Sequence, residues 1–309
     1  MQIMAPDYYK KFKCIAGDCK HSCCIGWEID IDSDTLEIYN NIKGAWGEKL
    51  KKVISYDGDA PHFITDSNDR CPFLNKEGLC DIITEFGEDG LCQICYDHPR
   101  FRNYFSDRVE MGLGLCCEAA TELILNSSND LSFIVLESDG KEGSPTAEES
   151  IVFSQREQLF NLFKNREIPL KQTMQRVADE YNVIFDRDIS SLVQTYRSLE
   201  RLDPEWDEYL NKTEQKSLDF DYILSLAERK IPLQARNLLC YFTYRYFANE
   251  GLLKNQQGAV KFMLEGIYFC LAVALSSCDD LNAKSFANVV RLFSSETEYS
   301  EENIRLLLN

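Results

Sequence analysis

Cysteines crowd the first third of this 309-residue chain and limit what it can fold into. Ten of the 13 cysteines lie between Cys14 and Cys117, and the other three are Cys240, Cys270 and Cys278. An even scatter would be typical of small buried apolar side chains. A dense cluster instead indicates cross-linking, by disulfide bonds or by metal. The same segment is rich in turns, so we expect it to need such cross-links to stay folded.

The absence of export and membrane signals bears on which cross-link forms. Residues 1–14 contain no apolar core or cleavage site typical of a signal peptide, and no run of 18 apolar residues occurs. The most apolar run, residues 266–275, suits a buried helix. We therefore expect a cytoplasmic protein with no membrane partner. Because the cytosol is reducing, the cluster favours metal over disulfide bonds.

Charge narrows the classes of partner. The chain has 51 acidic and 33 basic residues, which gives a net charge of −18. Nucleic acids and anionic membranes both require a basic surface, so we expect neither as a partner. A lysine-bearing protein surface is electrostatically favourable, although the same charge also serves solubility alone.

The pattern along the chain predicts a mainly α fold in two parts. Residues 1–136 are expected to form a loop-rich, Cys-rich metal-binding region, packed on an all-α helical domain of residues 148–309. Between them, the polar Gly- and Ser-containing stretch 137–147 is typical of a linker or exposed loop. No alternating run of Val, Ile or Thr predicts a strand.

Helices are predicted where apolar residues repeat at helical spacing. These segments are 35–42, 170–181, 192–199, 220–227, 232–251, 259–276, 286–293 and 303–308. Candidate N-caps are Asp32 or Ser33 for the first, a serine at 190 or 191 for the third, and Ser300 for the last. Gly251 is expected to end the helix that Pro232 begins.

The cysteine spacing predicts metal without identifying it. The pattern is Cys14-x4-Cys19-x3-Cys23-Cys24, Cys71-x8-Cys80-x11-Cys92-x2-Cys95 and Cys116-Cys117. Two intervening residues let the sulfurs of Cys92 and Cys95 turn toward one ion or cluster. Zinc favours two such pairs, whereas iron–sulfur clusters tolerate irregular spacing. Adjacent cysteines point apart, so the spacing leaves open whether there are one or two sites.

Three blocks of sequence resemble a known family. They are FKCIAGDCKHSCCIGWEIDID, CPFLNKEGLCDIITEFGEDGLCQICYDHPRF and EMGLGLCCEAA, which lie within residues 12–120. They are similar to the flagellin lysine-N-methylase family, part of a wider group named for a CxxCxxCC-type zinc- or iron-chelating region. The second half of the chain shares with that family only its helical character, and the matching blocks lie within residues 12–120.

The resemblance implies an activity, two cofactors and a set of ligands. The expected activity is methylation of lysine ε-amino groups on flagellin, or on another lysine-bearing protein. The expected cofactors are S-adenosylmethionine and an iron–sulfur cluster, with 4Fe-4S favoured over zinc. The positions that match family cysteines, and so are the expected metal ligands, are Cys14, Cys19, Cys23, Cys24, Cys71, Cys80, Cys92, Cys95 and Cys116. At Cys117 the family usually has proline, so we do not expect it to be a ligand.

The sequence does not reveal where the methyl donor binds. A doubly wound methyltransferase would have a Gly-rich turn after a strand, and Gly112-Leu-Gly114 lacks the third glycine. The radical-type Cys-x3-Cys-x2-Cys pattern is also missing. Catalytic and donor-binding residues therefore stay unassigned.

Several residues near the cysteines have two interpretations each. His21 and His98 are close enough in sequence to be ligands, but a hydrogen-bonding or surface role is more typical. Glu118 is a candidate base or a structural acceptor. Asp97-His98-Pro99-Arg100 is typical of a turn that supports the metal site, and Trp27 is predicted to cover that site.

An aromatic stretch in the second half is a candidate pocket for adenine or for a lysine stem. Its residues are Tyr241, Phe242, Tyr244, Tyr246 and Phe247, with Arg236 and Arg245. Aromatic stripes at helical spacing are more typical of a core.

Three functional hypotheses remain. The first is a lysine methylase of the flagellin type. The second is a non-catalytic zinc- or iron-binding protein with a structural Cys-rich domain and a helical partner-binding domain. The third is a protein that carries or delivers metal.

Overall fold

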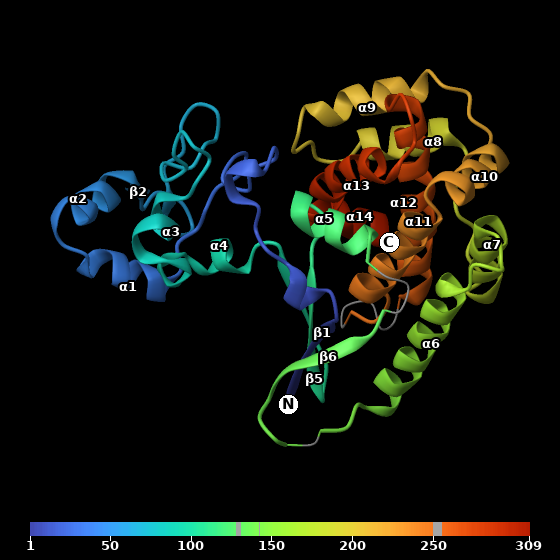
Figure 1. Cartoon of the computed structure of the whole chain (residues 1–309), viewed down its shortest axis with the longest axis horizontal. Coiled ribbons are helices and arrows are strands. Elements are labelled where there is room, and N and C mark those ends of the chain that lie inside the picture. The colour runs from blue at the N-terminus through green and yellow to red at the C-terminus, as the bar shows by residue number, and fades with distance from the viewer. Residues whose placement is uncertain (128–130, 142, 250–254) are drawn as a thin grey trace. The chain divides into compact units, whose positions relative to one another are not determined.

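The computed structural model describes residues 1–127, 131–141, 143–249 and 255–309 (Figure 1). The chain forms two compact units. Residues 1–12 and 101–309 form one, here called the helical unit, and residues 13–100 form the other, the cysteine-rich unit. Each unit has its own hydrophobic core. The cysteine-rich unit is thus an insertion in the chain of the helical unit.

This division differs from the expected one, which placed residues 1–136 together and a linker at 137–147. Residues 101–136 supply strands and a helix to the helical unit, and their apolar side chains join its core. Within the expected linker, a strand extends to Ser138 and a helix begins at Ala147. Thr146 caps that helix through a capping box with Glu149.

The helical unit contains a four-stranded mixed sheet, which the sequence did not predict. All four strands lie before residue 148, and the described part of residues 148–309 is helical, as expected. Its strands are β1 (Gln2–Pro6), β4 (Arg100–Tyr104), β5 (Arg108–Leu113) and β6 (Phe133–Ser138). The order is β4-β5-β1-β6, in which β1 pairs parallel to β5 and antiparallel to β6 (Figure 1). A register shift between Ile3 and Met4 marks an irregularity in β1.

A buried ion pair joins this sheet to the first long helix. Both carboxylate oxygens of Glu110 on β5 accept hydrogen bonds from the guanidinium of Arg156, each at 2.7 Å. Arg108 Nε donates to the same carboxylate at 2.9 Å. A buried carboxylate is stable only when it is paired. These contacts therefore explain how Glu110 can lie buried in the middle of β5.

Helices make up most of the helical unit. They are α5 (Glu118–Leu125), α6 (Ala147–Lys164), α7 (Leu170–Glu180), α8 (Ile189–Arg197), α9 (Glu205–Glu214), α10 (Phe220–Lys230), α11 (Pro232–Phe242), α12 (Gln256–Ser277), α13 (Ala283–Glu298) and α14 (Glu301–Leu308). Two short elements complete it, the 3-10 helix η1 (Tyr9–Lys11) and the π-helix η4 (Thr243–Phe247).

Helix α12 forms the centre of this unit. It packs against α7, α8, α9, α10, α11, α13 and α14. Its length and composition alone would allow it to cross a membrane, and it is the one such helix in the described part of the chain. However, 83% of its most apolar 18-residue window is buried inside the protein. It is therefore packed as a core helix.

Most predicted helices are confirmed, with two differences at their ends. Asp32 caps α1 and Ser300 caps α14, whereas α8 is capped by Asp188 rather than by a serine. The helix that Pro232 begins runs as α-helix to Phe242 and then changes to the π-helix η4. Its expected end at Gly251 lies outside the described residues.

The cysteine-rich unit is built from short elements around a small aromatic core. They are η2 (Ala16–Asp18), α1 (Ser33–Asn41), α2 (Gly44–Val53), β2 (Ile54–Ser55), β3 (His62–Phe63), α3 (Asp81–Phe86), η3 (Glu88–Gly90) and α4 (Gln93–Asp97). The rings of Tyr39 and Phe63 stack 6.1 Å apart, and Phe63 meets Phe73 edge-on at 5.0 Å. As predicted, this unit is rich in loops.

Candidate functional site

Five cysteines from separate segments gather in the cysteine-rich unit. Cys71 interacts electrostatically with Cys24, Cys80 and Cys92. Cys95 interacts with Cys92, Cys24 and Cys71. Cys71 and Cys92 are buried in the core, and the other three are half-buried and pack against it. We call these residues the five-thiol cluster.

Backbone hydrogen bonds bring the first three members together. Cys71 N donates to Cys24 O at 2.8 Å, which ties two segments 47 positions apart in sequence. Leu74 and Cys80 form a β-bridge, so Cys71 and Cys80 lie on the two arms of one hairpin-like loop. Backbone pairing thus brings these three residues near one another.

The other two members sit at the start of α4. Cys92 is the N-cap of this helix, and Cys95 follows one turn later. Their Sγ atoms are 4.0 Å apart, as expected for the Cys-x2-Cys spacing. The start of α4 is held by Asp32, whose carboxylate accepts a hydrogen bond from Gln93 N at 2.8 Å.

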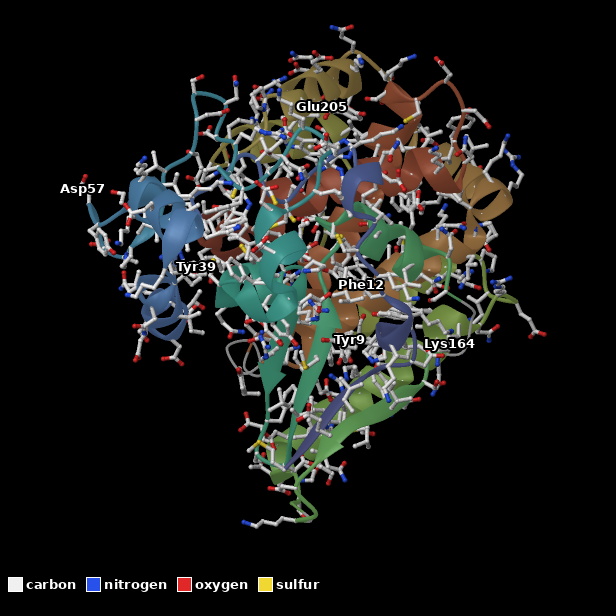
Figure 2. The ribbon with its side chains drawn as sticks, turned by 60° about the vertical axis from the view of Figure 1, so that its left-hand side comes forward. Tyr9, Phe12, Tyr39, Asp57, Lys164 and Glu205 are labelled. Atoms are coloured by element: carbon white, nitrogen blue, oxygen red, sulfur yellow. The ribbon has the colours of Figure 1, made fainter. Side chains whose placement is uncertain are left out.

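Tyr39 on α1, labelled in Figure 2, is a neighbour of three members of the five-thiol cluster, Cys92, Cys95 and Cys80. Its hydroxyl donates to Gly90 O at 2.7 Å. Burial raises the pKa of Tyr39, and the neighbouring Cys92, Cys95 and Cys80 thiols raise it further. Tyr39 therefore stays a neutral hydrogen-bonding group beside the sulfurs.

The five thiols differ in how easily they ionise. A hydrogen bond from Cys23, opposed by burial, lowers the pKa of Cys24 to about 7. A hydrogen bond from Cys95 lowers the pKa of Cys92, and the same contact raises the pKa of Cys95. Burial raises the pKa of Cys71 to about 12. Metal binding would have to displace the protons of the less acidic thiols.

The cluster is suitable for metal in chemistry but is not arranged as a finished site. All five donors are sulfur, the ligand type that iron–sulfur clusters and structural zinc prefer. Among the described residues, however, no group of three or more His, Cys, Asp or Glu side chains is close enough to hold a metal ion. Ligation would therefore require the side chains to rotate inward.

The remaining predicted ligands lie outside the five-thiol cluster. Cys14 and Cys23 are exposed and Cys19 is half-buried. Cys116 belongs to the helical unit, where burial raises its pKa to about 12 and Tyr299 hydrogen-bonds to it. The structure thus brings five of the nine predicted ligands together and places eight in one unit.

Trp27 and His98 pack together in the same unit. Trp27 Nε1 donates to Cys23 O at 2.6 Å, and its ring centroid is 6.3 Å from that of His98. Burial lowers the pKa of His98 to about 4, so its imidazole is neutral at pH 7. The indole thus contacts the backbone of the cysteine loop, and its role as a cover of a metal site stays a prediction.

The aromatic stretch of the second half lies in the core, the interpretation that its helical spacing favoured over a pocket, and its polar groups form a buried network. Tyr241 and Tyr246 donate to Glu298 Oε2 at 2.6 and 2.8 Å, and Arg245 Nη1 lies 2.8 Å from the same oxygen. The π-helix η4 carries Arg245 and Tyr246, and such π-turns are common near functional positions. A cavity of about 10 Å³ beside Tyr241 and Tyr244 is too small for adenine.

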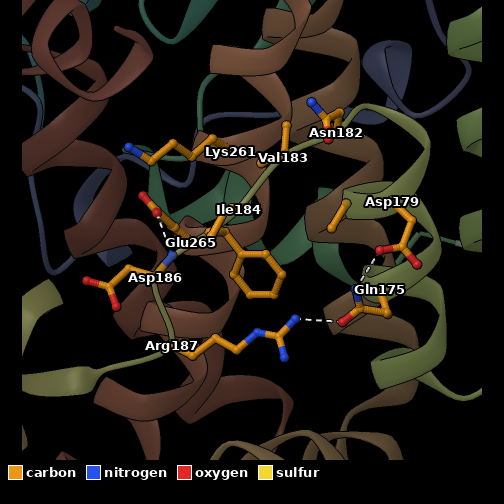
Figure 3. A pocket seen from close by; sticks show the side chains of 11 residues that line it. Gln175, Asp179, Asn182, Val183, Ile184, Asp186, Arg187, Lys261 and Glu265 are labelled. Carbon is orange, nitrogen blue, oxygen red and sulfur yellow. Dashed lines mark hydrogen bonds between the residues drawn. The ribbon is translucent and has the colours of Figure 1, made fainter.

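A larger groove, which the sequence did not indicate, lies in the helical unit. It has a volume of about 790 Å³ and is bordered by α7, the loop after it and α12 (Figure 3). Asp179, Asp186, Arg187, Lys261 and Glu265 supply its charged groups. The only sequence signal was the charged pair Lys261 and Glu265 before the apolar run of α12.

We compared the sequence with those of known proteins to test its resemblance to the flagellin lysine-N-methylase family. The chain is 25% identical over 169 residues to a protein named Lysine-N-methylase from Salmonella typhimurium, covering 52% of this chain and 41% of that protein. It is 27% identical over 138 residues to a protein named flagellar biosynthetic protein FliU from Salmonella muenchen, covering 42% of this chain and 80% of that protein. The resemblance to the flagellin lysine-N-methylase family is confirmed.

The match to the lysine-N-methylases covers only part of each protein. The chain spans about 41% of the length of these curated relatives. No family model matches the chain, and no solved structure matches it.

Proposed function

We propose that the protein is a lysine N-methyltransferase that acts on flagellin or another lysine-bearing protein. It would use S-adenosylmethionine as donor and hold an iron–sulfur cluster on cysteines of the cysteine-rich unit. The observation that carries this proposal is the similarity to proteins named Lysine-N-methylase, joined to five thiols that meet in one place.

Cys24, Cys71, Cys80, Cys92 and Cys95 supply more sulfur donors than the four that a cubane cluster needs. A bound cluster would supply a redox centre and an electron-poor iron. The chain itself holds Cys92 and Cys95 at the start of α4, keeps Tyr39 neutral beside them and packs Trp27 against the cysteine loop. These contacts limit the approach of water and orient the sulfurs.

Methyl transfer to lysine makes further demands on the protein. The attacking amine must be neutral and in line with the sulfonium, which requires a group to accept its proton and walls to position it. A net charge of −18 favours the approach of a lysine-bearing partner.

One observation favours the non-catalytic alternative. Cys71 and Cys92 are 6% and 0% exposed and form part of a small core. Metal held at such positions would act as a structural staple for a loop-rich unit. Only the proposed methyltransferase would transfer methyl groups to a protein substrate, so an activity measurement separates the two functions.

A single preparation tests both. We would purify the protein anaerobically, measure iron, zinc and acid-labile sulfide, and incubate it with flagellin and methyl-labelled S-adenosylmethionine. About four irons and four sulfides per chain, with label on flagellin lysines, is the expected result. Zinc without sulfide and no label on flagellin would support the structural alternative.

A further inference from the structure

Glu265 on α12 is a buried carboxylate with one unused oxygen. The residue is only 8% exposed, yet it lines the groove of about 790 Å³ (Figure 3). Its Oε1 accepts a hydrogen bond from Asp186 N at 2.8 Å. Within the described ranges its Oε2 has no hydrogen-bond or salt-bridge partner. This second oxygen faces the groove, where it can accept a hydrogen bond from a ligand.

The loop that forms the opposite wall is held firmly on α12. Asn182 adopts the left-handed conformation, with φ of 51°, and turns the chain away from α7. Besides the Asp186 contact, Tyr268 on α12 donates from its hydroxyl to Arg187 O at 3.1 Å. The loop is therefore tied to α12 through its backbone at two places, Glu265 and Tyr268.

The cations in the groove form no ion pair with Glu265 among the described residues, although the nearby charge of Lys261 acts to lower the pKa of Glu265. Arg187 Nη2 donates to Gln175 Oε1 at 2.6 Å, and its guanidinium stacks over Phe185 and Phe220. Lys261, one turn before Glu265, forms no salt bridge with any residue that the structure describes. Asp179 and Asp186 add two more carboxylates to the lining.

The loop also presents an apolar side chain to the solvent. Ile184 is 95% exposed and belongs to the groove lining. A fully exposed isoleucine beside a buried charge resembles the mixture of apolar contact and polar anchor found at protein-binding sites.

We propose that this groove binds a lysine side chain of a protein partner, with the lysine ammonium donating to Glu265 Oε2 and neighbouring partner residues packing on Ile184. This inference rests on the proposed function, in which that partner is the methyl-accepting protein. It adds a recognition site on the helical unit.

The geometry favours an ammonium over a guanidinium. Arginine binds a carboxylate best through two parallel hydrogen bonds, which need both oxygens. Oε1 is already occupied by Asp186 N, so one oxygen remains for a point-like donor. Burial raises the pKa of Glu265, and an incoming ammonium would lower it again.

The test uses the full chain and a blocked Gly-Lys-Gly peptide, with its acetyl-lysine counterpart as the uncharged control. Binding is followed by NMR titration without methyl donor. We expect the lysine peptide to bind and the acetyl-lysine peptide not to bind. Glu265→Gln should weaken binding at least about tenfold, because glutamine keeps the acceptor for Asp186 N but loses the charge.

Two further variants sharpen the test. Lys261→Gln removes a positive charge near Glu265 Oε2. The variant should bind the lysine peptide about two- to threefold more tightly, because the peptide ammonium is no longer repelled by Lys261. Glu302→Gln, at an exposed position of α14 outside the groove, should leave binding unchanged. The thermal midpoint of each variant reports whether it is folded.

Equal binding by folded Glu265→Gln, or by the acetyl-lysine peptide, would overturn the inference. Methyl transfer is measured separately on flagellin. Lysine-peptide binding that depends on Glu265, without any methyl transfer, would contradict the proposed function alone. Methyl transfer with no effect of Glu265 on peptide binding would contradict this inference alone.

Discussion

The carboxylate of Asp32 accepts a hydrogen bond from Gln93 N at 2.8 Å, across 61 positions of sequence. The same side chain caps α1 by accepting from Thr35 N at 3.0 Å. One residue therefore joins the start of α1 to the start of α4, the helix that carries Cys92 and Cys95. Its loss should affect both stability and metal binding.

Replacing Asp32 by alanine should lower the free energy of unfolding of the cysteine-rich unit by about 1 to 3 kcal/mol, because it removes a helix cap and a charge-assisted hydrogen bond. Urea unfolding followed by circular dichroism measures the change. Asp34→Ala, at an exposed position in the first turn of the same helix, is the matched control. Equal losses in the two variants would argue against the bridging role.

The same carboxylate gives a dependence on pH. Although burial opposes ionisation, hydrogen bonds from Gln93 and Thr35 lower the pKa of Asp32. Its contribution is therefore complete above the unfolded pKa of about 3.9 and is lost as the pH falls through the lower folded value. The stability difference between wild type and Asp32→Ala should shrink below about pH 4. A difference that grows on acidification would contradict the assignment.

Metal content should depend on the five-thiol cluster. Cys71→Ser should lower bound iron and sulfide, because Cys71 interacts with all four of the other thiols. Cys278→Ser, a half-buried cysteine of the helical unit, should leave both unchanged. Elemental analysis of anaerobic preparations makes the comparison. If both variants keep full metal, the sulfurs that hold it lie elsewhere.

The ion pair between Arg245 and Glu298 should be essential to the helical unit. Arg245→Met leaves the Glu298 carboxylate buried without its cation, which should cost about 3 to 5 kcal/mol of stability. Arg229→Met, at an exposed arginine of α10, is the control. Thermal and urea unfolding of the two variants measure the difference, and equal losses would contradict this role of Arg245.

Glu265→Gln should stabilise the protein at neutral pH. Burial raises the pKa of Glu265, so the folded state holds its proton more tightly than the unfolded state does. Its contribution is most favourable below the unfolded pKa of about 4.3 and declines as the pH rises through the raised folded value. The thermal midpoint of the variant should exceed that of wild type at pH 7, and the gap should close near pH 4. An unchanged thermal midpoint at pH 7 would show that burying the charge of Glu265 does not destabilise the folded state.

The local features of this fold were predictable from sequence. The Asp32 cap, the apolar stripe of α7 and the Ser300 cap depend on residues within a few positions of one another. Strand β5 was missed because Glu110 interrupts its apolar pattern. That glutamate is buried only because Arg156 reaches it from α6, and no local pattern reveals such a partner.

The candidate sites show the same limit. Spacing identified the cysteines as a set, but backbone pairing between distant segments decides which of them meet, as Cys24 and Cys71 do. The groove at Glu265 depends on a loop folded back onto α12, and its residues are unremarkable in sequence. Long-range contacts, which a linear pattern does not encode, create both features.

The placement of the cysteine-rich unit has a consequence for synthesis on the ribosome. Strand β1, at residues 2–6, can complete its pairing only with β5 and β6, which begin at residues 108 and 133. All of residues 13–100 must be translated before those partners emerge. The insertion can therefore collapse around its own core while β1 is still unpaired, before the helical unit has closed its sheet.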